Sequence, residues 1–475
     1  MTLWTKKELI EALSGELLDH KITDNLVIDE VVIDSRKTPK SGLFIALKGE
    51  KNDAHDFLKQ AAENGCKVLL VQDQSALEKA KNSDFIVVKD TFEALYKLAE
   101  FSRKRSPAKI IAITGSVGKT GTKEMLKLAF SSYGKTFATY GNLNNHIGLP
   151  LSLCNFAQDC QFGIFEMGMN HLNEIAPLSR LAKPHLAIIT NVGPVHIEFF
   201  KNEEEIALAK SEIFLGLIDG GLVMINRDNQ HFDFLKKRAE ISGIIPQNII
   251  SFGKDLKSDY CLKDSQIKAA DCAEISLQTK NNSEISYSIS ASSKTTIFNS
   301  IIVAGALDLL NKDLKTGLTQ LKNLQDTAGR GKAFEVNLGD KKITIIDDSY
   351  NASVLSMKAG LEYSLELKSA LQKKRVVAAL GDMLELGEKS VELHEEIANY
   401  LNQSHIEFAI LVGANMTTAA EKLHKDIYKT FLDSSAAALE IQSLLKDGDI
   451  LYVKGSRGMK MEKIIENLTK EKSAH

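Results

Sequence analysis

The sequence predicts an α/β protein with more than one domain, in which two long stretches each form a doubly wound, mostly parallel sheet. Strands of buried character alternate with helical segments along both stretches, as expected for βα units. The chain has 475 residues, too many for one ordinary core. Hydrophobic residues make up 44% of it and charged residues 25%, so a disordered chain is excluded.

The first hundred residues predict a small α/β unit. A helix is expected to begin near Thr5, because Thr5 and Glu8 have the spacing of a capping box. Strands are expected at residues 26–36, 43–49, 67–71 and 85–90, with a helix at 57–65. The charged, proline-containing segment 103–109 marks a domain boundary.

The rest of the chain predicts two sheets in succession. Strand 109–115 leads into a helix at 120–133, and buried strands follow at 161–168, 185–193 and 221–229. Residues 250–298 are more polar and β-like, and their order is left open before a helix at 299–310. The alternation then resumes with strand-then-loop units at 343–351, 375–383, 408–413 and 449–457. That second run predicts another doubly wound domain.

Composition narrows the classes of function. The 59 Lys and Arg nearly balance the 62 Asp and Glu, giving a net charge of −3, so the strongly basic surface of a simple nucleic-acid binder is not expected. The five cysteines are scattered and form no Cys-x-x-Cys pair, which fits a reducing compartment. No signal peptide and no membrane span is expected. We therefore expect a soluble, cytoplasmic protein.

A glycine-rich loop lies between strand 109–115 and the following helix. Its glycines allow a tight turn whose N–H groups can face phosphate oxygens, Lys119 can reach the β- and γ-phosphates, and the Thr120 hydroxyl can ligate Mg²⁺. The spacing departs from the common phosphate loop, which has four residues between the glycines where this chain has two. A chance turn is the alternative, but the flanking strand and helix favour nucleoside triphosphate binding. The predicted cofactor-binding residues of this loop are Thr114, Gly115, Ser116, Val117, Gly118, Lys119, Thr120 and Gly121.

Two further strand ends carry polar groups suited to a hard cation. Glu166 closes one buried strand, and His196 follows another. Ligands of open α/β sheets bind beyond the carboxyl ends of the strands, where a carboxylate oxygen and an imidazole suit a phosphate-bridging metal. Taken alone, Glu166 is better explained as a helix-cap partner, and His196 is as well explained as a backbone-bonded loop residue; together, on neighbouring strand ends beside the glycine-rich loop, they favour a metal site. Lys210 lies on an amphipathic helix, where most lysines are solvated.

A set of longer motifs identifies the chain as resembling the Mur ligases over nearly its whole length. These motifs are DSRKTPKSGLFIALKGE, ITGSVGKTGTKEM, NLNNHIGLPLSL, FEMGMNHLNEI, TNVGPVHIEFF, LAKSEIF, IDDSYNASVLSM, LGDMLELGEKSVELHEEI and VKGSRGMKME. The resemblance implies three domains: a UDP-sugar-binding domain at 1–104, a central ATP-binding phosphate-loop domain at 105–325 and a C-terminal Rossmann-like domain at 326–475. It also implies ATP-dependent amide bond formation through an acyl phosphate.

The resemblance is strongest to the branch that joins D-alanyl-D-alanine to UDP-N-acetylmuramoyl-tripeptide, so these two substrates, ATP and Mg²⁺ are the implied ligands. It implies catalytic roles for Lys119, Glu166, His196 and Lys210 and metal contacts for Thr120, Glu166, His196 and Lys210, with Lys210 at the position that is carbamylated in relatives. It places nucleotide contacts at Asn299, Arg330 and Asp348. It places substrate contacts at Ser35, Arg36, Asn144, Asn145, His146, Asn351, Asp382, Lys454 and Arg457, with Glu385 in the same closing region. A monomer is expected, without nucleic acid.

Three positions depart from the family pattern. Phe298 stands where relatives often have His, Ala54 interrupts the usual Asp-Gly-His, and Gly121 follows Thr120 where Ser or Thr is usual. None removes a phosphate or metal contact. Three alternatives remain: a sibling ligase that adds one amino acid (diaminopimelate or lysine), a folylpolyglutamate synthetase, and a nucleotide-dependent switch protein without ligase chemistry.

Overall fold

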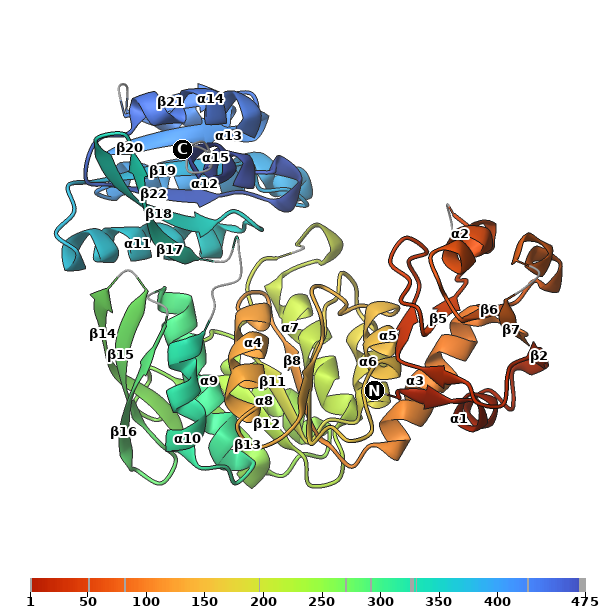
Figure 1. Ribbon diagram of the computed structural model, residues 1–475. Helices are drawn as coiled ribbons and strands as arrows, with labels where there is room; N and C mark the ends of the chain where they lie inside the picture. Colours follow the sequence, from red (N-terminus) through yellow and green to blue (C-terminus); the bar gives the residue numbers. More distant parts are fainter. Residues whose placement is uncertain are drawn as a thin grey trace.

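The computed structural model describes residues 2–49, 52–80, 83–195, 197–269, 271–290, 293–324, 329, 331–424 and 427–469. Within these ranges the chain forms sheets of five, nine and six strands and a two-stranded pair. They follow one another along the chain, with the N-terminal sheet at one end and the C-terminal sheet above the green strands of the central part (Figure 1). The α/β class predicted from the sequence is confirmed. No helix of the described residues is long and apolar enough to cross a bilayer.

The N-terminal sheet has the strand order β2-β7-β6-β5-β4 and is parallel except for the β2–β7 pair. The capping box at Thr5 and Glu8 is confirmed, since both of its hydrogen bonds are present at the start of α1. The bounds are β1 (Trp4–Thr5), α1 (Lys6–Ala12), β2 (Leu17–Lys21), β3 (Val27–Ile28), β4 (Glu30–Val32), β5 (Gly42–Ile45), α2 (Leu58–Glu63), β6 (Val68–Val71), β7 (Asp84–Val88) and α3 (Thr91–Arg105).

The central sheet has the order β16-β15-β14-β13-β12-β11-β8-β10-β9. Its strands are parallel from β9 to β14, and β14, β15 and β16 extend it as an antiparallel meander, which resolves the polar stretch that the sequence left open. The bounds are β8 (Lys109–Thr114), β9 (Thr136–Ala138), β10 (Phe162–Glu166), β11 (Leu186–Ile189), β12 (Leu222–Asn226), β13 (Ile249–Gly253), β14 (Tyr260–Ala269), β15 (Cys272–Gln278) and β16 (Glu284–Ile289). Strand β8 lies between β10 and β11, which sets the geometry of the site.

Helices cover both faces of this sheet. On one face α4 (Lys119–Phe130), α9 (Lys294–Leu309) and α10 (Leu314–Thr319) pack in one apolar cluster. The other face is covered by α5 (Gly148–Cys154), α6 (Ile175–Ala182), α7 (Glu203–Ser211) and α8 (Phe232–Ile241). Helix α9 begins five residues before the predicted start, because Ser293 caps it by accepting a hydrogen bond from the Thr296 N–H.

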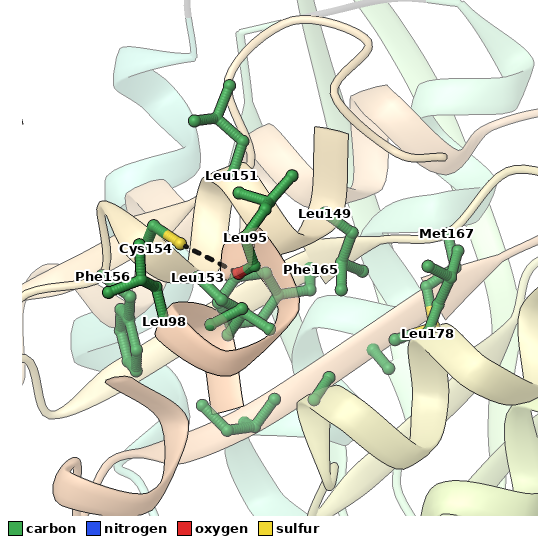
Figure 2. Packing of buried hydrophobic residues seen from close by; sticks show 14 of the residues in the cluster. Leu95, Leu98, Leu149, Leu151, Leu153, Cys154, Phe156, Phe165, Met167 and Leu178 are labelled. Atoms are coloured by element: carbon green, nitrogen blue, oxygen red, sulfur yellow. Dashed lines mark hydrogen bonds between the residues drawn. The ribbon is translucent and has the colours of Figure 1, made fainter. Parts of the chain in front are cut away.

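Helix α3 joins the first part of the chain to the central sheet. Leu95 and Leu98 of α3 pack against α5 and against Phe165 of β10, and the Cys154 thiol lies 3.6 Å from the Leu95 carbonyl oxygen (Figure 2). The predicted boundary between residues 104 and 105 falls at the end of this helix and stays a prediction. The boundary between residues 325 and 326 lies outside the described residues.

The C-terminal sheet has the order β17-β18-β22-β19-β20-β21, parallel except for the β17–β18 pair. Helices α11 (Val354–Ala370), α12 (Ser390–Gln403) and α13 (Ala414–Ala419) pack on one face, and α14 (Ser434–Leu444) and α15 (Glu462–Thr469) on the other. The strands are β17 (Lys332–Leu338), β18 (Lys341–Asp348), β19 (Arg375–Gly381), β20 (Phe408–Val412), β21 (Tyr428–Phe431) and β22 (Asp449–Lys454).

Candidate active site

The loop between β8 and α4 holds a backbone conformation that only glycine adopts readily. Gly115 has φ +152° and Gly118 has φ +83°. A Cβ atom at Gly115 would lie 2.0 Å from Thr190 Oγ1, and one at Gly118 would lie 2.3 Å from Asn299 Nδ2. The Ser116 N–H donates to the Asn191 carbonyl oxygen at 2.8 Å. The loop is therefore fixed against the end of β11 and against α9, at the carboxyl edge of the sheet and at the N-terminus of a 12-residue helix.

Thr120 and Glu166 meet at this edge because β8 and β10 are neighbouring strands. The Thr120 hydroxyl donates to Glu166 Oε2 at 2.8 Å, and the Asn144 amide donates to Glu166 Oε1 at 2.9 Å. Thr120 and Glu166 are both buried. Two of the predicted metal-contacting residues thus lie together, and Asn144 from the predicted substrate-facing loop joins them.

Two lysines, Lys119 and Lys210, lie close enough for the charge of one to act on the other. Lys119 Nζ donates to the Gly115 carbonyl oxygen at 2.5 Å, which holds its ammonium against the loop. Lys210, near the end of α7, is only 4% exposed. Burial lowers the pKa of the Lys210 ammonium well below its usual value, and the charge of Lys119 lowers it further. Lys210 is therefore not the solvated helix lysine that its sequence pattern alone suggests.

A cavity of about 650 Å³ lies beside the loop. Residues from Ser116 to Gly121 line it from the central part, and Asp348, Asn351 and Lys454 line it from the C-terminal part. Lys454 Nζ lies 2.5 Å from Asp348 Oδ2, which also accepts a hydrogen bond from the Tyr452 hydroxyl at 3.1 Å. Burial raises the pKa of the Asp348 carboxyl, although the neighbouring Lys454 charge opposes this. Both parts of the protein thus contribute to one binding space.

Two of the predicted substrate-contacting residues, Asn145 and Asp382, use their side chains to accept hydrogen bonds from backbone N–H groups at the start of a helix. Asn145 Oδ1 accepts hydrogen bonds from the N–H groups of Ile147 and Gly148, where the chain enters α5. Asp382 accepts hydrogen bonds from the Asn415 and Met416 N–H groups at the start of α13. These two side chains therefore stabilise helix starts in this structure.

The remaining predicted contacts are spread over the molecule. Ser35 is buried and donates to Gln60, whereas Arg36 is exposed and pairs with Asp34 at 2.8 Å, holding the pKa of that carboxyl near 2. His146 lies near Phe92 of α3, with ring centroids 6.1 Å apart. The Arg457 guanidinium lies over the Tyr350 ring, 5.2 Å from its centroid. His196 and Arg330 lie outside the described residues.

The cavity also has walls that sequence reasoning missed. Asn226 ends β12 and Asp228 follows it, Lys254 follows β13, and Ser293 to Thr296 lie at the start of α9. Asn226, Asp228 and Lys254 could have been found from the sequence, because ligands bind at the carboxyl ends of parallel strands, and β11, β12 and β13 are consecutive parallel strands of the sheet. The start of α9 could not, because it falls in the polar, β-like stretch 250–298 whose order the sequence left open.

The donor set fits a hard divalent cation. Thr120 and Glu166 offer a hydroxyl and a carboxylate oxygen at one buried point beside the phosphate loop. Mg²⁺ prefers oxygen ligands and is usually bound by one or two protein oxygens together with phosphate oxygens. Among the described residues, no three His, Cys, Asp or Glu side chains gather as a metal cluster. The predicted contact from His196 is not tested by this geometry, since that residue is outside the described ranges.

Comparisons with known proteins cover almost the whole chain. Residues 27–103 match the Mur ligase family catalytic domain, residues 113–307 the Mur ligase middle domain and residues 334–457 the Mur ligase glutamate ligase domain. A UDP-N-acetylmuramoyl-tripeptide–D-alanyl-D-alanine ligase of Rickettsia prowazekii is 36% identical over 98% of this chain and 99% of its own.

Two solved structures are similar over the same extent. Crystal structure I of MurF from Acinetobacter baumannii has a TM-score of 0.85 at 28% identity, covering 98% of this chain and 99% of that one. The MurF ligase of Thermotoga maritima, solved in complex with ADP, has a TM-score of 0.77 at 26% identity, covering 95% of this chain and 99% of its own.

Proposed function

Because the chain belongs to the Mur ligase family, we propose that it joins D-alanyl-D-alanine to the terminal carboxylate of UDP-N-acetylmuramoyl-tripeptide in an ATP-dependent reaction that forms ADP. The observation that carries this function is the phosphate loop, which presents Lys119 and Thr120 to a cavity shared by the central and C-terminal parts. The full-length similarity to D-alanyl-D-alanine ligases, one of them solved with ADP, favours the dipeptide over a single amino acid as the acceptor.

The chemistry requires electrostatic assistance at the loop. A carboxylate is a poor electrophile, so the tripeptide acid is first phosphorylated to an acyl phosphate, and attack on the γ-phosphate brings two anions together. We expect that negative charge to accumulate beside Lys119, which is held against the loop, and beside the N–H groups at the start of α4. Contacts of this kind are typically each worth on the order of 2–4 kcal/mol of transition-state stabilisation.

Mg²⁺ is part of the proposal, with Thr120 and Glu166 as the residues that would hold it. When bound, it supplies positive charge that neutralises the phosphate oxygens. The side chain of Asn144 donates to Oε1 of Glu166, and the other carboxylate oxygen, Oε2, faces Thr120.

The amine attacks the acyl phosphate and releases inorganic phosphate, and water must be kept away from that intermediate. The cavity has walls from both parts of the protein, so closure of the C-terminal part over the loop would exclude water while the dipeptide is delivered. Asn351 and Lys454 line this wall and are the proposed contacts on the C-terminal side.

Lys210 is proposed to be carbamylated. Only the neutral amine reacts with carbon dioxide, and the lowered pKa of the buried Lys210 raises the neutral fraction. Carbamylation would convert the buried amine into an anionic oxygen ligand. The variant Lys210→Ala should lose most activity, and short carboxylic acids such as acetate should restore part of it. Full activity in the variant would refute the assignment.

The cellular setting follows from the substrates. We propose a cytoplasmic step of peptidoglycan precursor synthesis, and through it a part in cell wall formation, cell shape and cell division. The five cysteines are all free thiols, which suits a reducing compartment. We also propose a monomer, which size-exclusion chromatography with light scattering tests directly.

The central test of the proposed function measures ADP release by the variant Lys119→Ala with UDP-tripeptide and D-alanyl-D-alanine as substrates. The variant should abolish ADP release that depends on both UDP-tripeptide and D-alanyl-D-alanine, and unchanged turnover would refute the assignment of the phosphate loop.

Mass spectrometry of products made with UDP-tripeptides ending in diaminopimelate or in lysine identifies the third residue. Turnover with a single amino acid but not with D-alanyl-D-alanine would favour the sibling ligase instead.

A further inference from the structure

Lys123, on the second turn of α4, is a fully buried lysine that the proposed mechanism does not use. Its side chain is 0% exposed. Its ammonium donates to the Thr139 carbonyl oxygen at 2.7 Å and pairs with Glu124 at 3.0 Å. A buried ammonium is costly unless it is paired and hydrogen-bonded, so its two partners mark a specific arrangement rather than chance burial.

The Thr139 carbonyl that Lys123 holds has been turned away from the sheet. Thr139 follows β9, and its N–H still donates to the Ile164 carbonyl oxygen at 3.0 Å, as in a parallel ladder. A continuing ladder would next pair the Glu166 N–H with the Thr139 carbonyl oxygen. That N–H instead donates to the Thr139 hydroxyl at 3.2 Å, while the carbonyl accepts from Lys123. The strand therefore leaves the sheet at the level of Glu166, and Lys123 satisfies the carbonyl that is released.

This departure determines where Glu166 and its partners lie. The segment that leaves the sheet at Thr139 continues to Asn144, whose amide holds Glu166 Oε1. Thr139 holds the backbone of Glu166 at the same level, and Thr120, one helical turn before Lys123, holds Oε2. Lys123 thus ties the phosphate-loop helix to the segment that fixes both the backbone and the carboxylate of Glu166.

We propose that Lys123 is a positioning residue that, through Thr139 and Asn144, orients the Glu166 carboxylate for the divalent cation. This rests on the proposed function, because it takes Glu166 as the metal-binding carboxylate. Loss of an outer partner of a metal ligand typically weakens metal affinity by about 10–100-fold. A lysine that merely filled the core would leave metal affinity unchanged in a folded variant.

The test compares Lys123→Met with Lys127→Met, a control at an exposed position on the same helix. Mn²⁺ binding in the presence of ADP is measured by electron paramagnetic resonance, and metal-free ADP binding by calorimetry in EDTA. Lys123→Met should weaken Mn²⁺ binding by about 10–100-fold and leave metal-free ADP binding unchanged. The control should change neither. Unchanged Mn²⁺ affinity, or equal losses of Mn²⁺ and metal-free ADP binding, would overturn the proposal.

Two further variants keep the outcome decisive. If Lys123→Met does not fold, Thr139→Val tests the next step of the same route, because valine keeps the carbonyl that Lys123 contacts but removes the hydroxyl that accepts the Glu166 N–H. Weakened Mn²⁺ binding supports the route through Thr139, and unchanged binding overturns the proposal. Glu166→Gln separates the two levels of inference. If Glu166→Gln weakens Mn²⁺ binding and Lys123→Met leaves it unchanged, only the positioning role of Lys123 fails. If Glu166→Gln also leaves Mn²⁺ binding unchanged, the metal role of Glu166 fails as well. The ligase activity is judged separately by Lys119→Ala.

Discussion

Replacing Gly118 by alanine tests whether the loop conformation itself makes the nucleotide site. Gly118 has φ +83°, where an L residue costs roughly 1–2 kcal/mol. The new Cβ would also lie 2.3 Å from the amide nitrogen of Asn299, which is 5% exposed on α9 and has little room to move. If the loop relaxes to escape this strain, nucleotide binding must restore it, so the dissociation constant should rise by at least about 5–30-fold.

Gly121→Ala is the matched control three residues further along. Gly121 does not have a positive φ, and a Cβ atom there would meet nothing within 4 Å. Alanine within a helix is favoured over glycine by roughly 0.5–1 kcal/mol, so this variant should be slightly more stable and bind ADP normally. Calorimetry with ADP and thermal unfolding followed by circular dichroism measure both effects. Equal ADP affinity in the two variants would show that the strained loop does not determine binding.

Other predictions concern pH, stability and a helix cap. Burial, with help from nearby cations, lowers the pKa of His185 from 6.5 to about 4, and its Nδ1 accepts the Ile110 N–H. Between these pH values the folded state binds fewer protons than the unfolded state, so the melting temperature should fall as the pH is lowered from 6.5 to 4. The fall should be smaller in His185→Asn, and equal slopes in the two proteins would contradict the prediction. Trp4→Phe leaves the Cys154 carbonyl without its indole donor at 2.8 Å and should cost about 1–3 kcal/mol in urea unfolding; an unchanged midpoint would argue against it. Asp382→Ala removes the cap of α13 and should cost about 0.5–2 kcal/mol, and a loss of activity without any loss of stability would instead support a substrate contact.

Local patterns were enough to predict much of the fold and the centre of the site. The phosphate loop was recognisable because its strand, glycines and helix are contiguous in the sequence. The position of Glu166 followed from a general property of parallel sheets, since β10 pairs directly with β8 and strand ends of neighbours meet at one edge. These inferences depend on local periodicity and on the sheet, and both leave a clear signal in one sequence.

Long-range partners left no such signal. The carboxylate of Asp382 caps a helix that begins 32 residues later, so the sequence could not distinguish a cap from a substrate contact. Nothing in the sequence distinguishes Lys123 from other helical lysines, because its partner Thr139 lies 16 residues away beyond a turn and a strand. The buried position of Lys210 was equally hidden. Each of these roles is set by tertiary packing that overrides the average behaviour of the residue type.

The pair formed by Asp348 and Lys454 shows how this changes the roles assigned to single residues. The family resemblance gave them separate functions, one toward the nucleotide and one toward the substrate. In the structure they are direct partners on the adjacent parallel strands β18 and β22, and their side chains pair at 2.5 Å on the wall of the shared cavity. Removing Asp348 leaves the buried Lys454 ammonium without its partner, and removing Lys454 leaves the half-buried Asp348 carboxylate without its own. A loss of activity in a single variant therefore reports the pair and not the residue. The two residues are therefore better regarded as one charged unit, in which any contact with nucleotide or dipeptide competes with the contact that each makes to the other.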